Sequence, residues 1–173
     1  MLLTSKLTLF LSWRIEGTMP KDLRKFVIAA GTHTSNWDYI LMLGVTARLG
    51  LRPRVLIKRE AFFPPLGMFL RFFGGIPVNR AEPQTLVADL LEDIGAAEEF
   101  VLIVTPEGTR TSDGSLKSGF FRIAREAGLS IVPATVHAER KLVKIHAPIA
   151  AEDKTAVFER ISRLFASSTG LRN

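Results

Sequence analysis

A histidine and an aspartate that could form a catalytic pair, His33 and Asp38, stand five positions apart in the segment Thr-His-Thr-Ser-Asn-Trp-Asp. A carboxylate that accepts a hydrogen bond from one imidazole nitrogen fixes the tautomer and leaves the other nitrogen free to remove a proton. The pair therefore predicts general-base chemistry. A structural interpretation stays open beside it, in which Asp38 and Ser35 cap a helix and His33 bonds a backbone carbonyl.

Four further charged residues follow segments that have the pattern of strands: Lys58, Arg80, Glu107 and Arg110. The carboxyl ends of parallel strands meet at one edge of a sheet, and open α/β sheets carry their sites at that edge. We therefore expect these residues near His33, where the three cations could bind a phosphate by charge-assisted hydrogen bonds. In the alternative interpretation, Glu107 and Arg110 form an ion pair that only shapes their loop.

The elements that must position these residues alternate between strand and helix patterns. The expected strands are 26–30, 54–58, 76–80, 100–104, 131–136 and 142–146, and the expected helices are 37–49, 82–99, 120–127 and 155–166. This alternation predicts an α/β fold with a mostly parallel central sheet of about six strands flanked by helices. Because proline lacks an N–H, Pro133 predicts that its strand lies at an edge or carries a bulge.

Two apolar segments are candidates for contact with lipid. In residues 1–16, large apolar residues that include Trp13 would share one helical face, which predicts an amphipathic membrane-contact segment; packing of this face on the core is the alternative. Residues 61–73 contain five of the twelve phenylalanines, which predicts either a plug in the core or a lipid-facing surface. We find no apolar run that could span a bilayer and no signal-peptide pattern.

Composition and missing motifs narrow the possible functions. A chain of 173 residues, of which 47% are hydrophobic and 23% charged, fits one domain over residues 1–173. The lack of cysteine removes thiolate nucleophiles and suits a cytosolic protein. A net charge of +6 predicts anionic partners, but the basic residues are scattered without a recognition motif, so we expect no nucleic acid.

Metal chemistry and serine-esterase chemistry find little support in the sequence. His137 and His146 lack metal-ligand spacing to each other or to His33, so we expect structural histidines and no metal. A Gly-x-Ser-x-Gly elbow is missing, which leaves no nucleophile to pair with His33. A serine-esterase mechanism is therefore not expected.

Taken together, four stretches resemble the glycerolipid acyltransferase family, which includes the lysophosphatidate and glycerol-3-phosphate acyltransferases. The His-x4-Asp block of that family resembles His33 to Asp38, and its Gly-rich second block resembles Gly74 to Arg80. Its Glu-Gly-Thr-Arg block stands here as Glu107 to Arg110, and its apolar block around a proline is similar to Ile131 to Ala134. The order and spacing match over most of the chain, and the family's lysine before the second block corresponds to Lys58.

This resemblance implies a glycerol-3-phosphate acyltransferase-like fold and a role in phospholipid biosynthesis. The implied reaction moves a fatty acyl group from an acyl-CoA or acyl-carrier-protein thioester to a hydroxyl of a lysophospholipid acceptor like 1-acylglycerol-3-phosphate, with no cofactor. The implied location is cytoplasmic, peripheral on the anionic inner face of the cell membrane. The implied site has His33 as base, Asp38 as its orienting partner, and Lys58, Arg80, Glu107, Gly108, Thr109 and Arg110 as substrate-binding residues.

The chain also differs from typical lysophosphatidate enzymes. Thr32 stands where those enzymes carry an asparagine before the histidine, and the apolar segment at 1–16 is shorter than their N-terminal helical pair. The sequence of the block from His33 to Asp38 resembles a shorter bacterial branch of the family. Two alternatives therefore stay open: an acyltransferase that acts on another lipid acceptor, such as a lyso-ornithine lipid, and a catalytically silent lipid-binding module.

Overall fold

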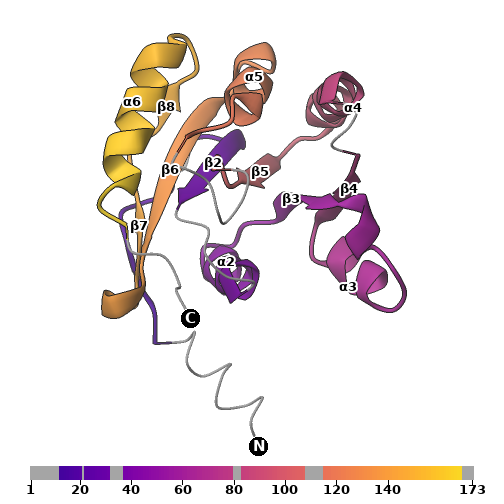
Figure 1. Ribbon diagram of the computed structural model, residues 1–173, viewed down its shortest axis with the longest axis horizontal. Coiled ribbons are helices and arrows are strands. Elements are labelled where there is room, and N and C mark those ends of the chain that lie inside the picture. The colour runs from indigo at the N-terminus through magenta and orange to yellow at the C-terminus, as the bar shows by residue number, and fades with distance from the viewer. Residues whose placement is uncertain (1–11, 21, 32–36, 80–82, 108–114, 169–173) are drawn as a thin grey trace, which may run out of the picture.

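The computed structural model describes residues 12–20, 22–31, 37–79, 83–107 and 115–168. Strands and helices alternate along the chain, as the sequence predicts, and form one mixed sheet with helices on both faces (Figure 1). The strands are β1 (Arg14–Glu16), β2 (Lys25–Gly31), β3 (Pro53–Lys58), β4 (Gly75–Val78), β5 (Phe100–Val104), β6 (Ser130–His137), β7 (Leu142–Ile145) and β8 (Ile149–Ala150). The helices are α2 (Trp37–Arg48), α3 (Leu66–Phe72), α4 (Pro83–Ala96), α5 (Gly119–Glu126) and α6 (Lys154–Phe165), with short 3-10 turns at η1 (Arg59–Ala61) and η2 (Ala138–Arg140).

The sheet has the strand order β1-β7-β6-β2-β5-β3-β4, and β8 pairs with β6 beside this path. The five strands from β6 to β4 run parallel, β1 is parallel to β7, and β7 and β8 run antiparallel to β6. The predicted fold class is therefore confirmed. The described residues form eight strands rather than about six, because β1 and β8 are only three and two residues long. Segments this short leave no periodic pattern in a sequence.

Of the two alternatives predicted for Pro133, the edge position was wrong, because β6 lies inside the sheet between β7 and β2. Pro133 is opposite Ala29 of β2 in a continuous parallel register, and its other side faces β7 and β8. Its carbonyl accepts a hydrogen bond from the backbone N–H of His146 at 2.9 Å. The N–H and the carbonyl of one strand residue point to the same side of the strand. The N–H that proline lacks would therefore face the gap where the hydrogen-bonded neighbour of β6 changes from β7 to β8. The register also shifts by one residue there, since Ala134 is opposite Ile145 but Ile131 is opposite Ile149. The partner side thus carries one extra residue beside Pro133, as at a bulge.

Two apolar layers hold the helices against the sheet. Helices α4, α5 and α6 cover one face, and α2 and α3 lie on the other (Figure 1). The first layer joins Leu102 of β5 and Ile131 of β6 to Phe121 of α5 and Ile161 of α6. Leu102 is fully buried, so Leu102→Ala would leave a cavity that costs about 2 to 5 kcal/mol. The continuous apolar run of β5 thus has the central position that its sequence predicts.

The second layer positions α2, the helix that follows the His33 segment. Ile28 of β2, Ile103 of β5 and Val132 of β6 form its buried floor, and Met42 packs on it from α2. The side-chain hydroxyl of Thr46 donates to the backbone carbonyl of Met42 at 2.8 Å, so this polar group is satisfied within the helix. The predicted helix over residues 37–49 is confirmed to within one residue of its end.

The N-terminal prediction needs one correction within the described residues. Trp13, which we expected on a lipid-facing stripe, is only 4% exposed and packs with Leu41 and Val143. Residues 14–16 form strand β1 on the edge of β7 instead of continuing a helix. Burial of the large indole surface makes Trp13 part of the core. Residues 1–11 lie outside the described residues, and none of the described helices has the length and hydropathy to cross a membrane.

Candidate active site

The strand and the helix predicted on either side of the His33 segment are present in the fold. Strand β2 ends at Gly31 and helix α2 begins at Trp37. Asp38 is the second residue of α2, which agrees with a place in the first helical turn. His33 itself lies outside the described residues, as does the side chain of Asp38. The hydrogen bond between the two therefore stays a prediction.

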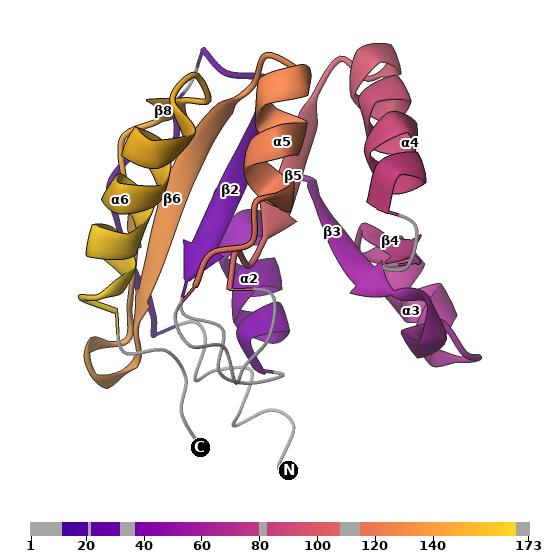
Figure 2. The ribbon, with the colours of Figure 1, turned by 45° about the horizontal axis from the view of Figure 1, so that its top comes forward.

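Lys58 and Glu107 are brought to the same edge of the sheet. Lys58 is the last residue of β3, and Glu107 stands three residues beyond β5. Because β2, β5 and β3 are adjacent and parallel, their carboxyl ends meet at the edge where β2 ends before the His33 segment (Figure 2). Arg80, Gly108, Thr109 and Arg110 follow β4 and β5 in the chain and lie outside the described residues.

The two described site residues differ in their surroundings. Lys58 is exposed, and its Nζ lies 4.0 Å from a carboxylate oxygen of Glu60, an exposed pair of little energetic weight. Glu107 is only 7% exposed, and the loop that carries it is held by a 2.7 Å hydrogen bond from the Lys117 N–H to the Pro106 carbonyl. A buried carboxylate is suited to organising its loop, whereas an exposed ammonium group is free to meet a ligand.

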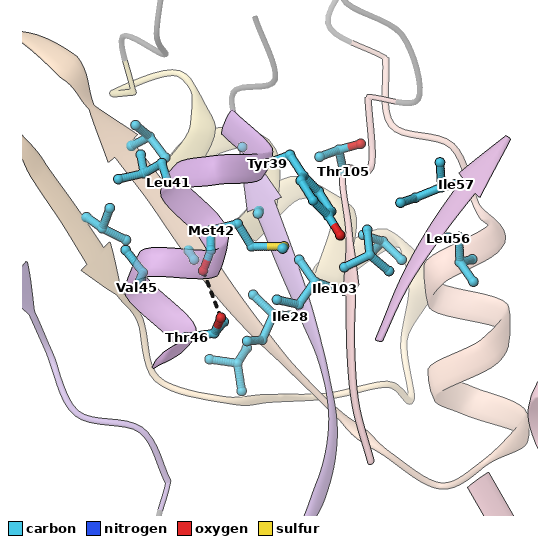
Figure 3. Close-up of a pocket in the computed structure, with 18 of the residues that line it drawn as sticks. Ile28, Tyr39, Leu41, Met42, Val45, Thr46, Leu56, Ile57, Ile103 and Thr105 are labelled. Atoms are coloured by element: carbon cyan, nitrogen blue, oxygen red, sulfur yellow. Dashed lines mark hydrogen bonds between the residues drawn. The ribbon is translucent and has the colours of Figure 1, made fainter. Parts of the chain in front are cut away.

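An apolar cavity of about 740 Å³ opens beneath α2. Its wall is formed by α2 on one side and by the sheet from β7 to β3 on the other (Figure 3). Met42 and Val45 contribute from α2, and Ile28, Ile103 and Ile57 contribute from three parallel strands. The cavity reaches Lys58 at the carboxyl edge of the sheet. An apolar volume with a cation in its lining fits an amphiphilic ligand.

One polar group, the hydroxyl of Tyr39, points into this cavity. Tyr39 is the third residue of α2, and its ring extends toward the side of the cavity formed by Ile103 and Ile57 (Figure 3). Its oxygen is buried and has no hydrogen-bond partner among the described residues. Burial raises the pKa of Tyr39, so the hydroxyl keeps its proton and can donate. Sequence analysis missed this residue, although a tyrosine within the apolar run 39–45 was a usable signal.

The comparison with protein families bears directly on this arrangement. The profile of the family described as "Acyltransferase" matches residues 14–137, which is more than half of the chain. The chain belongs to the acyltransferase family. The matched residues run from β1 to the end of β6, and they include the turn after β2, the Lys58 edge and the loop that carries Glu107.

Several curated relatives match part of the acyltransferase chain. A protein of Limnanthes douglasii named 1-acyl-sn-glycerol-3-phosphate acyltransferase is 28% identical over 127 residues, which cover 69% of this chain and 43% of that protein. A chloroplastic 1-acyl-sn-glycerol-3-phosphate acyltransferase of Arabidopsis thaliana is 30% identical over 121 residues, covering 64% and 33%. The chain thus spans less than half the length of these relatives.

A solved structure shares the fold of this acyltransferase. The crystal structure of the 1-acyl-sn-glycerophosphate acyltransferase PlsC from Thermotoga maritima superimposes with a TM-score of 0.63 at 21% sequence identity. The match covers 94% of this chain and 73% of the other. The similarity extends beyond the family match at residues 14–137, so the order of strands and helices is shared over nearly the whole chain.

The Tyr39 hydroxyl leads to a prediction about stability. We expect Tyr39→Phe to leave the free energy of unfolding unchanged or to raise it by about 1 kcal/mol, because a buried hydroxyl without a partner costs desolvation energy. Thr46→Val is the matched control, since its buried hydroxyl does have a partner and its loss should cost about 1 kcal/mol. Urea denaturation of both variants measures the difference. An equal loss in both would show that Tyr39 already has a partner in the free protein.

The remaining two histidines meet at a buried threonine on β6. The Oγ1 atom of Thr135 lies 3.2 Å from Nε2 of His137 and 3.0 Å from Nε2 of His146, and Thr135 is fully buried. These contacts agree with the structural interpretation of both histidines. In the part of the chain that the structure describes, no three His, Cys, Asp or Glu residues come together as a metal site would require.

His146 is expected to make the stability of the chain depend on pH. The pKa of His146 is lowered below the ordinary value of 6.5, mainly by burial of the imidazole. The nearby positive charges of Lys144, His137 and Arg160 lower it further. As the pH falls below the ordinary value the unfolded chain binds a proton that the folded chain does not, so the free energy of unfolding falls. We expect His146→Gln to flatten this decline in urea denaturation between about pH 7 and pH 5. An unchanged slope would show that other groups cause the decline.

Proposed function

We propose that this chain transfers a fatty acyl group from an acyl-CoA or acyl-carrier-protein thioester to a hydroxyl of a lysophospholipid acceptor resembling 1-acylglycerol-3-phosphate. The observation that carries the proposal is the apolar cavity of about 740 Å³, which lies between α2 and the sheet and has Lys58 among its lining residues. An acyl chain would fill such a volume, and a cation in its lining would meet a phosphate. Membership of the acyltransferase family and the names of the curated relatives support the same reaction.

In this mechanism His33 acts as the general base. It removes the proton of the acceptor hydroxyl while Asp38 holds the imidazole tautomer and stabilises the imidazolium. The acceptor oxygen forms a bond to the thioester carbonyl carbon, the carbon–sulfur bond breaks, and His33 returns its proton to the departing thiolate. A thioester is already activated, so holding both substrates together supplies much of the remaining acceleration. The reaction needs no covalent acyl-enzyme and no cofactor.

The residues that follow β3, β4 and β5 would bind the anionic parts of the substrates. Lys58 and Arg80 offer positive charge to a phosphate, and the segment Glu107–Arg110 adds a second arginine with Gly108 and Thr109 before it. Glu107 is buried, which supports a role in placing this loop rather than in reacting. A bidentate arginine contact would also orient the acceptor hydroxyl toward His33.

We further propose that the protein acts on the cytoplasmic side of the cell membrane as a peripheral protein. The net charge of +6 favours a surface of anionic lipids, where both amphiphilic substrates and products would reside. An acyl carrier protein, which would present an acidic surface, is a second partner that this charge would suit. Residues 1–11, the part of the predicted segment that precedes the buried Trp13, would add an amphipathic contact with lipid.

Mass spectrometry of lipid products tests the proposed function. The chain is incubated with acyl-CoA or acyl-carrier protein and with a panel of acceptors that includes lysophosphatidate and lyso-ornithine lipid, and the extracted lipids are compared with those from His33→Ala. We expect a product heavier by one acyl group with lysophosphatidate and none with the variant. A product formed only from lyso-ornithine lipid would replace the acceptor. No product with any pair, despite retained lipid binding, would identify a silent lipid-binding module.

A further inference from the structure

The exposed apolar surface of the described residues is concentrated on one short segment. Large hydrophobic side chains that are exposed all lie between residues 63 and 72, on helix α3 and the turn before it. They are Phe63 at 58%, Leu66 at 39%, Met68 at 75%, Phe69 at 47% and Phe72 at 83% exposure. We call these five residues the α3 patch. Single exposed apolar residues are ordinary, but five within ten positions mark a contact surface.

Only one side of helix α3 is used by the fold. Gly67 and Leu70 are its buried residues, and a side chain at Gly67 would meet the carbonyl oxygen of Phe62 at 2.6 Å. Leu70 approaches strand β4 through its carbonyl, which lies next to Gly75. A helix of seven residues is not stable alone, so these contacts fix it to the β3–β4 end of the sheet. Its large side chains thereby stay outside the core.

The aromatic rings of the segment pack on one another instead of on the core. The ring centroids of Phe69 and Phe73 are 4.5 Å apart, and those of Phe72 and Phe73 are 5.1 Å apart. The guanidinium of Arg71 lies 5.3 Å from the centroid of the Phe62 ring. These contacts hold the segment in shape and leave Met68 and Phe72 outermost. The patch is therefore ordered before it meets a partner.

Exposed basic side chains outnumber acidic ones in the part of the chain that carries the α3 patch. Residues 52–79 contain five basic side chains and one acidic side chain, Glu60, and all six are exposed. A groove beside Phe72 is lined by Arg52, Arg54 and Arg71. Glu98 and Glu99 also line it, and a carboxylate oxygen of Glu99 lies 3.8 Å from a guanidinium nitrogen of Arg24. Apolar rings with an excess of cations complement an anionic, partly apolar surface.

We infer that the α3 patch docks the protein on an anionic lipid bilayer, with the aromatic side chains in the interfacial region and the basic side chains among the head groups. Two copies of the chain meeting at this patch would bring Arg71 and the neighbouring arginines close to their own copies, which is a repulsive arrangement. A lipid surface of opposite charge offers apolar surface to the rings and anionic head groups to the cations. The bilayer is therefore the partner that the surface fits.

Docking through this patch has a consequence for the cavity, and this step rests on the proposed function. Helix α3 follows β3 and lies beside its carboxyl end (Figure 2). Lys58, the last residue of β3, lines the cavity, and only η1 and the turn at 62–65 separate it from α3. A bilayer in contact with α3 would thus lie near the Lys58 side of the cavity, from which an acyl lipid would enter.

Vesicle co-sedimentation of the full chain tests this inference. The vesicles contain either phosphatidylcholine alone or an equimolar mixture with phosphatidylglycerol. We expect the double variant Met68→Ser, Phe72→Ser to bind the mixed vesicles at least about tenfold more weakly than the wild type. Arg71→Gln should weaken binding to mixed vesicles only. Arg125→Gln, which removes an exposed arginine from α5 on the opposite face of the sheet, is the matched control and should bind normally.

Controls separate docking from folding and from catalysis. Met68 and Phe72 are mostly exposed, so the double variant should keep its circular dichroism spectrum and melting temperature. Binding is also measured for His33→Ala, which should dock like the wild type even if the proposed reaction is wrong. Equal binding by the double variant and the wild type would overturn the inference. So would a concentration-dependent dimer that the double variant abolishes while neither protein binds vesicles, since the patch would then join two copies.

Discussion

His33→Ala is expected to reduce acyl transfer by roughly 10²- to 10⁴-fold or more, because the proposed reaction loses its general base. The fold should not change, since residue 33 stands between the end of β2 and the start of α2 and contributes to neither. The measurement is acyl transfer under saturating substrates, together with circular dichroism and urea denaturation. Full activity in a folded variant would remove His33 from the mechanism.

Asp38→Asn separates the two interpretations of the aspartate. If Asp38 holds the imidazole, the amide favours the wrong tautomer, and we expect a loss of activity of the size seen in the serine-protease triad, about 10⁴-fold. If Asp38 serves only the first turn of α2, the variant loses a favourable charge near the helix N-terminus, worth about 0.3 to 1 kcal/mol of stability, with little effect on rate. The ratio of kinetic loss to stability loss distinguishes a catalytic partner from a cap.

The pH profile adds a second readout for the same pair. A neutral imidazole is needed to accept the proton, so kcat/KM should fall at low pH with the pKa of the free enzyme's base. We expect Asp38→Asn to move this limb to lower pH, because a carboxylate favours the imidazolium and an amide does not. A limb that stays in place in the variant would contradict contact between His33 and Asp38.

Long apolar runs were the most predictable part of the fold. Residues 100–104 carry no polar side chain, and a strand buried on both faces in the middle of a parallel sheet is the arrangement that satisfies all of them. Helix α6 was predictable for a different reason, because Val157, Ile161 and Phe165 recur every four residues and bury one face. In these segments the local pattern and the tertiary environment favour the same structure.

The errors arose where tertiary contacts decide the outcome. Pro133 fits inside the sheet only because β7 gives way to β8 beside it, and no local pattern reports such a break. Trp13 is apolar enough for a membrane or a core, and the neighbouring side chains of Leu41 and Val143 decide for the core. The segment 61–73 posed the same ambiguity with the opposite result, because only Gly67 and Leu70 of α3 find a place inside.

The candidate site was predictable in its chemistry and less so in its shape. The sheet-edge rule places Lys58 and Glu107 at the edge where β2 ends, because Lys58 ends β3, Glu107 follows β5, and the three strands are adjacent and parallel. The cavity depends on how closely α2 approaches the sheet, which side-chain periodicity does not report. The inward hydroxyl of Tyr39 was missed for this reason, because an apolar helical pattern does not distinguish a packed face from one that lines a hollow.

Arg80→Ala and Arg110→Ala are expected to raise the KM for a phosphorylated acceptor far more than the KM for the thioester donor. An arginine that binds a phosphate does so in the ground state and the transition state alike, so its loss acts on binding rather than on kcat. A charge-assisted hydrogen bond is worth about 1.5 to 3 kcal/mol, which corresponds to an acceptor kcat/KM about tenfold to hundredfold lower for each arginine. Lysine at either position should recover only part, because it cannot make the bidentate contact.

Lys58→Ala provides a comparison within the same cluster, because Lys58 is exposed and borders the apolar cavity. An exposed ammonium group contributes less than a bidentate arginine, so its loss should raise the acceptor KM by a smaller factor than either arginine variant. Steady-state kinetics with both substrates varied, on lysophosphatidate and on an acceptor without phosphate, measures all three variants. If the arginines bind the acceptor phosphate, the losses vanish with the acceptor that lacks it. Losses confined to the donor KM would instead assign the cluster to the phosphates of the thioester carrier, and the acceptor would then be selected by the cavity rather than by charge.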